Sequence, residues 1–270
     1  MNKALLSLLL ALAGLAIFLF GNPYYRAFPT NGNQAYYVAL AVSFLALTAV
    51  VGRRLPLSRY RPAAYALFTA SAALLAFSAG LIRLATLAMA PLQQLAMDKL
   101  SQFLSVVPVI VVLNWIPGND LRAVYIARGR LRQGLAFGLL SFAGWGALAH
   151  LLGLLPAEVY RAPGSAIPWL LLFAFANAAM EELWFRGLFL KPYRKLIGAP
   201  GAMLVTAAVF GLSHVPAAYA FPGGGWVFGA VVFVLGAISA HAIIKHESLI
   251  GAVLFHAGYD LLVVGTVLMS

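Results

Sequence analysis

The chain has 270 residues, of which 63% are hydrophobic and only 9% are charged. A soluble globular protein carries about 25% charged residues, so this composition excludes a water-soluble globular domain and indicates a polytopic membrane protein. The net charge of +11 arises without any Lys- and Arg-rich run interleaved with aromatic residues, so no nucleic-acid partner is expected. The absence of cysteine excludes disulfides, cysteine-ligated zinc and a cysteine nucleophile.

Apolar runs long enough to cross a bilayer, about 20 residues each, predict an all-α fold with eight to nine transmembrane helices. In chain order the candidate helices are 4–20, 35–51, 63–82, 101–116, 134–152, 167–190, 201–219, 225–244 and 248–268. Residues 84–100 fit this scheme least well. We expect them either to extend the third helix or to lie as an amphipathic segment at the outer surface.

The basic residues are distributed unevenly between the two sides that nine helices would define. One side holds Lys3, Arg53, Arg54, Arg59, Arg61, Arg122, Arg128, Arg130, Arg132, Lys191, Arg194, Lys195 and Lys245. The other side holds Arg26, Arg83, Lys99 and Arg161. Because cytoplasmic loops carry the excess of Lys and Arg, this bias predicts a cytoplasmic N-terminus and an external C-terminus. We expect an integral protein of a bacterial inner membrane.

Ionisable side chains inside predicted helices are concentrated in the last four. Each costs about 2.5 to 3.5 kcal/mol at a helix centre for Asp, Lys or Arg, so such residues indicate function. The first five helices offer only His150, which lies near a helix end. The last four contain Glu181, Glu182, Arg186, His214, His241, His256 and Asp260. We therefore predict N-terminal membrane helices of unknown role over 1–133 and a catalytic helical core over 134–270, with the active site between the last four helices.

The stretch "EELWFRG" separates two adjacent glutamates by geometry. Glu182 and Arg186 are four residues apart and lie on one helix face, where they can pair. Glu181 is rotated by about 100° from Glu182 and lies on the face of Asn177. The Glu182–Arg186 pair either only stabilises helix packing or belongs to the functional site. Glu181 is the candidate functional carboxylate.

Two further pairs follow at the same spacing. "FGLSH" places Phe210 and His214 on one helix face, and "HAGYD" does the same for His256 and Asp260. A carboxylate beside an imidazole can fix its tautomer in a catalytic or metal site, although a buried pair joining two helices is the plainer alternative. Counted from residue 201, His214 would lie nearer the outer side than Glu181, so we expect its helix to begin deeper or to tilt.

Convergence of Glu181, His214, His256 and Asp260 would support amide hydrolysis by activated water. A carboxylate beside a neutral histidine can take a proton from water, and a second histidine can stabilise the oxyanion that forms. Alternatively, Glu181, His214 and His256 could bind a divalent metal such as zinc and leave a position open for water. Neither version needs a cysteine, and the sequence does not decide between them.

These three stretches, in this order on successive helices, resemble the motifs EExxxR, FxxxH and Hxxx(N/D) of the CAAX protease and bacteriocin-processing (CPBP/Abi) family of intramembrane endopeptidases. The resemblance covers about residues 170–265. It implies Glu181 as the base that activates water, with His214 beside it. It also implies His256 and Asp260 in oxyanion stabilisation or substrate positioning, and Glu182 with Arg186 as an architectural pair. Asp260 departs from the prenyl-protein endopeptidases, which have Asn at this position.

We therefore expect an intramembrane endopeptidase with a membrane-associated peptide or protein substrate and the lipid bilayer as its partners. The family implies prenylated C-termini, leader peptides or C-terminal membrane anchors as substrates, and a bacterial membrane argues against the first. One alternative is a proton- or ion-coupled transporter, which would predict repeated halves with polar residues in both. A second alternative is a non-catalytic membrane scaffold.

Overall fold

The computed structural model describes residues 2–21, 30–86, 88–217 and 222–268, and within these ranges the chain forms helices and no strands. The predicted all-α class is confirmed. Helices suit this sequence because they satisfy their own backbone hydrogen bonds, which lipid cannot do. The α-helices are α1 (Lys3–Phe18), α2 (Thr30–Arg53), α3 (Arg61–Ser78), α4 (Pro91–Trp115), α5 (Leu131–Leu151), α6 (Ala157–Arg161), α7 (Pro163–Glu181), α8 (Leu190–His214), α9 (Gly224–His246) and α10 (Ile250–Leu268). The remaining helical segments are the 3₁₀ helices η1 (Leu55–Tyr60) and η2 (Leu121–Val124) and the π-helix η3 (Glu182–Gly187).

In the described part of the chain, six helices are long and apolar enough to cross a membrane. They are α2, α4, α5, α7 continued through η3, α8 and α9, and the apolar helices α1 and α10 are shorter. This number supports an integral membrane protein. It does not confirm the predicted count of eight to nine spans.

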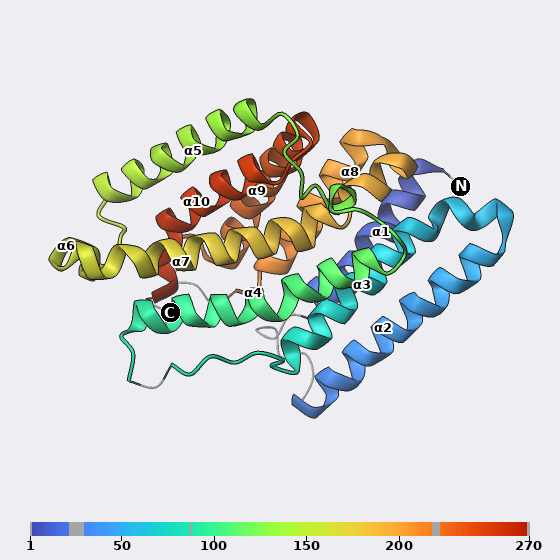
Figure 1. Cartoon of the computed structure of the whole chain (residues 1–270), viewed down its shortest axis with the longest axis horizontal. Coiled ribbons are helices and arrows are strands. Elements are labelled where there is room, and N and C mark those ends of the chain that lie inside the picture. The colour runs from blue at the N-terminus through green and yellow to red at the C-terminus, as the bar shows by residue number, and fades with distance from the viewer. Residues whose placement is uncertain (1, 22–29, 87, 218–221, 269–270) are drawn as a thin grey trace.

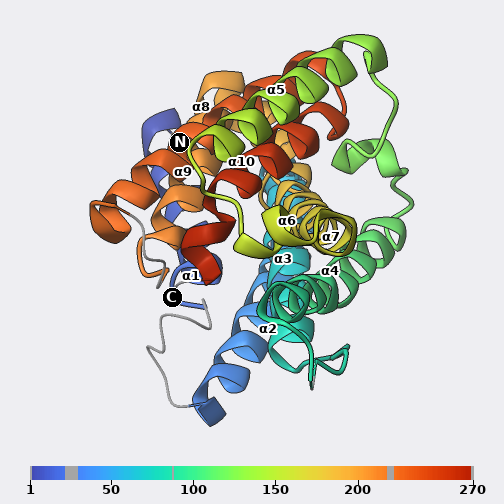
Figure 2. The ribbon, with the colours of Figure 1, turned by 90° about the vertical axis from the view of Figure 1, so that its left-hand side faces the viewer.

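The helices of the N-terminal half pack directly on those that carry the ionisable residues. α1 and α3 contact α8, and α4 contacts α7. In Figures 1 and 2, α5 lies along α10 at one edge of the bundle, and α2 lies beside α3 at the opposite edge. The boundary at residue 133 stays a prediction, but helices from both sides of it enclose the same core.

The prediction for residues 84–100 was wrong in its second half. α3 ends at Ser78, and α4 begins at Pro91 rather than at residue 101. Proline at the first position of a helix loses no hydrogen bond, because the first amides have no partner within the helix. Residues 91–100 are therefore the first turns of a long membrane helix, and neither an extension of α3 nor a surface segment.

The connections rich in basic residues meet at one end of the bundle. Arg194 pairs with Glu247 at 3.0 Å, and Lys191 donates to the backbone carbonyl of Arg122. The amide of Arg130 donates to the carbonyl of His246 at 2.7 Å. Figure 1 shows the N-terminus at this end and the C-terminus at the other. The connections are thus grouped as the charge pattern predicts, while the orientation of this end toward the cytoplasm stays a prediction.

Glycines allow α5 and α10 to approach closely. A Cβ atom on Gly138 would lie 2.6 Å from the Cβ of Leu254, and one on Gly251 would lie 2.7 Å from the carbonyl oxygen of Gly134. Both distances are shorter than van der Waals contact. Small residues at such positions let two membrane helices pack through their backbones, which adds dispersion contacts.

We predict that Gly138→Val destabilises the protein by about 1 to 3 kcal/mol, because the added side chain overpacks the α5–α10 interface. Gly144→Val on the same helix is the matched control, since its Cβ would meet nothing within 4 Å. The measurement is thermal unfolding of both purified variants in detergent. Equal melting temperatures for the two variants would contradict the close packing described here.

Candidate active site

The "EELWFRG" segment changes helix type where the two glutamates stand. Glu181 is the last residue of α7, and Glu182 begins the π-helix η3. The amide of Leu188 donates to the carbonyl of Leu183 at 3.1 Å, five residues back. The indole N–H of Trp184 donates to the carbonyl of Ala70 at 3.2 Å and so ties this wider turn to α3. Short π segments are rare and are often found at functional sites.

The predicted pair of Glu182 and Arg186 is present and completely buried. The Nε of Arg186 donates to Oε2 of Glu182 at 2.8 Å, and its Nη2 donates to Oε1. The guanidinium also stacks over Phe210, with Cζ 4.0 Å from the ring centroid. Two opposite charges that share hydrogen bonds can be buried together, whereas either one alone would be very costly.

His256 is bound by a different carboxylate from the one that the sequence suggested. Its Nδ1 donates to Oε1 of Glu182 at 2.8 Å, while its Nε2 lies 3.6 Å from Oδ1 of Asp260. Asp260 instead accepts a hydrogen bond of 3.1 Å from the amide of Asn177. Glu182 therefore holds both Arg186 and His256. The carboxylate of Asp260 stands beside the far nitrogen of the same imidazole.

Glu181 points toward both catalytic candidates. Its Oε2 lies 3.9 Å from Nε2 of His214 and 3.6 Å from Nε2 of His256. Both distances are too long for a direct hydrogen bond and suit a water molecule between the groups. The three side chains and Asp260 line a cavity of about 30 Å³, which is enough for a single water molecule.

His214 reaches this cavity at the end of α8, which is kinked in its first half. The helix begins at Leu190 and bends at Gly198, whose φ of 83° and ψ of 170° are non-helical. The stretch "IGAPGA" contains this non-helical break, so a helix begins there as predicted, and it follows a shorter helix that starts at Leu190. His214 is the last residue of α8, and its Nδ1 donates to the carbonyl of Phe210 at 2.8 Å. This bond leaves Nε2 facing Glu181 with its lone pair.

Lys99 also lines the cavity, and the sequence reading placed it outside the membrane. Lys99 lies in α4 and is only 8% exposed. Its side chain interacts electrostatically with His214 and Asp260. The available signal was the spacing of Leu92, Ala96 and Lys99, which follows one helix face. Once Pro91 is recognised as a helix start, this spacing turns Lys99 inward. The cavity therefore receives a positive charge from the N-terminal half of the chain.

Among the residues that the structure describes, no group of three or more His, Asp or Glu side chains is arranged to hold a metal ion. The predicted ligands Glu181, His214 and His256 face one cavity, but their arrangement does not form a metal site of this kind. We therefore derive no reaction step through a metal.

His150 and His241 lie outside this cluster. His150 is at the end of α5, where its carbonyl accepts from the hydroxyl of Tyr160 at 3.3 Å. His241 is exposed on α9. The structure thus brings Glu181, Glu182, Arg186, His214, His256 and Asp260 together and leaves these two histidines apart.

Comparison with known families matches this same region. Residues 162–262, a little over a third of the chain, match the family model described as Type II CAAX prenyl endopeptidase Rce1-like. The match confirms the resemblance carried by the three motifs, and all six candidate residues lie within the matched segment. Comparisons with curated proteins and with solved structures gave no match. The matched segment is similar to this endopeptidase family, and the apolar helices indicate an integral membrane protein.

The different surroundings of the two glutamates predict different effects on stability. Glu182→Gln leaves the buried guanidinium of Arg186 without its counter-ion and should destabilise the fold by about 3 to 5 kcal/mol. Glu181→Gln changes a group that faces the cavity and should stay within about 0.5 kcal/mol. Thermal unfolding of the two isosteric variants in the same detergent measures the difference. A larger loss for Glu181→Gln would reverse the roles assigned to the pair.

Proposed function

We propose that the protein is an intramembrane endopeptidase that hydrolyses a peptide bond of a membrane-associated substrate with water activated by Glu181. The observation that carries this proposal is the position of the Glu181 carboxylate, 3.9 Å and 3.6 Å from the two imidazole Nε2 atoms across a water-sized cavity. A carboxylate and an imidazole that can both reach one water molecule form a general-base site.

In the proposed reaction, Glu181 takes a proton from the water while Nε2 of His214 accepts its second hydrogen bond. The resulting hydroxide attacks the carbonyl carbon of the scissile bond, and the carbonyl oxygen becomes an oxyanion. Protonated Glu181 then gives its proton to the leaving amine as the carbon–nitrogen bond breaks. The products are a carboxylic acid and an amine, and no covalent enzyme intermediate is needed.

His256 is the proposed donor to the oxyanion. In its imidazolium form it donates Nδ1–H to Glu182, which leaves Nε2–H directed into the cavity. Such a fixed donor in a water-poor site stabilises charge that develops in the transition state. Asp260, held by Asn177, orients this imidazole from 3.6 Å. Orienting the imidazole is a role that an ionised Asp260 can fill. Direct donation of a hydrogen bond to the oxyanion would require the protonated form of Asp260.

The cavity also bears on how substrate enters. About 30 Å³ admits water but not a peptide. The surrounding wall is apolar and includes Phe228 and Val232 of α9 and Val263 of α10. A peptide can therefore reach Glu181 only when helices around the cavity move apart. Leader peptides and C-terminal membrane anchors are the proposed substrates, because both present extended apolar segments at a membrane.

The direct test is cleavage of a library of membrane-associated peptides by the purified, reconstituted protein, with products identified by mass spectrometry. Glu181→Gln should lower kcat/KM by about 10²- to 10⁴-fold, the usual contribution of a general base. His241→Ala is the matched control and should cleave as the wild type does. Full activity of Glu181→Gln would refute the assignment of the base. A wild type without cleavage on any peptide would favour the transporter or scaffold alternative.

We further expect cleavage to survive removal of divalent metals. The reaction proposed above uses only side chains of the chain itself, so dialysis against a chelator should leave kcat/KM unchanged. Metal analysis of the same sample gives the occupancy before and after dialysis. Loss of activity that zinc restores would replace this mechanism with the metal alternative, in which Glu181, His214 and His256 are the ligands.

A further inference from the structure

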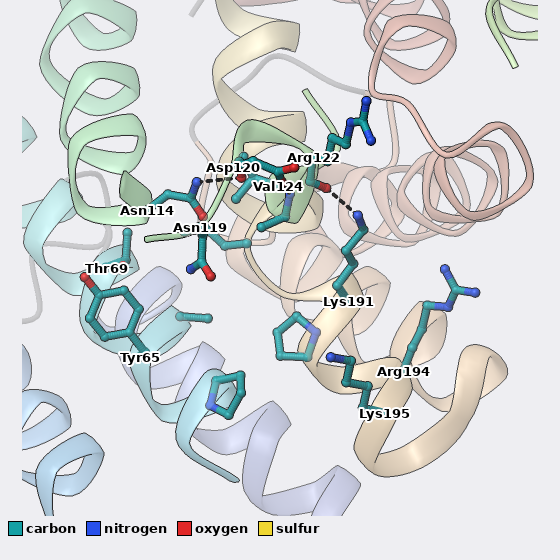
Figure 3. Close-up of a pocket in the computed structure, with 15 residues that line it drawn as sticks. Tyr65, Thr69, Asn114, Asn119, Asp120, Arg122, Val124, Lys191, Arg194 and Lys195 are labelled. Carbon is teal, nitrogen blue, oxygen red and sulfur yellow. Dashed lines mark hydrogen bonds between the residues drawn. The ribbon is translucent and has the colours of Figure 1, made fainter. Parts of the chain in front are cut away.

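A second, larger cavity lies apart from the catalytic one. It measures about 690 Å³ and opens between α3, the connection that follows α4 and the first turns of α8 (Figure 3). It shares no lining residue with the cavity around Glu181. None of the three sequence motifs lines it, so the proposed peptidase activity does not account for it.

The rim of this cavity is strongly basic. Arg122, Lys191, Arg194 and Lys195 line it, against the single carboxylate of Asp120. That carboxylate already accepts a hydrogen bond of 3.2 Å from the amide of Ala123, which caps η2. Figure 3 shows the ammonium of Lys195 and the amide of Asn119 directed into the cavity. Arg194 already pairs with Glu247 at 3.0 Å, and Lys191 donates to the carbonyl of Arg122, so Lys195 is the cation that an entering anion would meet first.

Two of these cations are held in place by the buried Tyr125. The ammonium of Lys191 lies over its ring, 4.6 Å from the centroid, and Arg194 donates to its hydroxyl at 3.1 Å. Cations fixed in this way lose less side-chain entropy when a ligand binds. The rim is thus partly organised before any ligand arrives.

The inner wall supplies an independent sign of a ligand. Thr69 lines the cavity, is only 1% exposed, and its hydroxyl has no hydrogen-bond partner in the described structure. An unsatisfied buried polar group costs about 1 to 3 kcal/mol, so such groups call for an explanation. A ligand oxygen in the cavity would satisfy this hydroxyl.

We propose that this cavity binds the phosphate group of an anionic phospholipid. Its walls belong to the connections that carry most of the basic residues, which the charge pattern places at the cytoplasmic membrane surface. Basic pockets between membrane helices on that side suit lipid phosphates. Ala66, Val124 and Leu188 add an apolar wall for the glycerol and upper acyl chain. Free inorganic phosphate shares the same chemistry, and the experiment separates the two.

The lipid would also brace the segment that holds the catalytic side chains. Leu188 follows η3 directly, and a Cβ on Gly187 would lie 3.1 Å from the carbonyl oxygen of Val124. The cavity therefore borders the turn that carries Glu182 and Arg186. Occupancy should raise the stability of the fold by mass action.

The test is a titration of the detergent-solubilised full chain with short-chain phosphatidylglycerol, followed by thermal shift. Phosphatidylcholine, which has no net charge, and inorganic phosphate are titrated in parallel. Phosphatidylglycerol should raise the melting temperature in a saturable way, and the other two should not.

Lys195→Gln should weaken the apparent affinity for phosphatidylglycerol about fivefold, as expected for one cation at a membrane surface. Thr69→Val should also weaken it, because only the hydroxyl is lost.

Lys245→Gln is the matched control, since this exposed lysine stands at the same end of the bundle but does not line the cavity. Its affinity for phosphatidylglycerol should equal that of the wild type. An equal loss in Lys245→Gln, or no difference between the two lipids, would overturn the site. A shift that inorganic phosphate reproduces alone would overturn the lipid as its source. None of these readouts needs cleavage, so the outcome is separate from the proposed peptidase function.

Discussion

The buried ion pair of Glu182 and Arg186 is the constraint on which the rest of the site depends. Both side chains have no exposed surface, and in such surroundings neither charge is tolerable without the other. The same carboxylate accepts the Nδ1–H of His256 and so joins η3 to α10. Because Glu182 is committed to these partners, Glu181 is the one of the two adjacent glutamates that faces the small cavity. In the proposed mechanism, Glu182 stabilises the fold and Glu181 acts on water.

The π-helix η3 lets Glu181 and Glu182 point to different partners, and helices of the N-terminal half hold η3 in place. The wider turn begins at Glu182, immediately after the last α-helical residue, Glu181. Trp184 donates a hydrogen bond to α3, and Lys99 of α4 is the only lysine or arginine among the residues that line the small cavity around Glu181. Helices outside the segment that matches the endopeptidase family therefore help to build its site.

Much of the fold could be predicted because a transmembrane helix requires a long apolar run. Each of the nine predicted runs overlaps a described helix, although only six of the described helices are long and apolar enough to cross a membrane. Spacing within one helix also gave the Glu182–Arg186 pair correctly. Contacts between helices could not be derived this way, so His256 was paired with Asp260 rather than Glu182. The helical turns before Gly198 were missed because Lys191, Arg194 and Lys195 are typical of a connecting loop. Lys99 was missed because a charged residue near a weakly apolar segment reads as a surface residue.

In the proposed mechanism, water activated by Glu181 attacks the scissile bond directly. The most direct measurement is a single turnover in water enriched in oxygen-18, followed by mass spectrometry of the cleaved peptide and of the enzyme peptide that contains Glu181. Direct attack by water predicts one heavy oxygen in the new carboxylate of the product and none in Glu181. Heavy oxygen in Glu181 with an unlabelled product would show that the glutamate attacked the peptide itself, and would contradict direct attack by water.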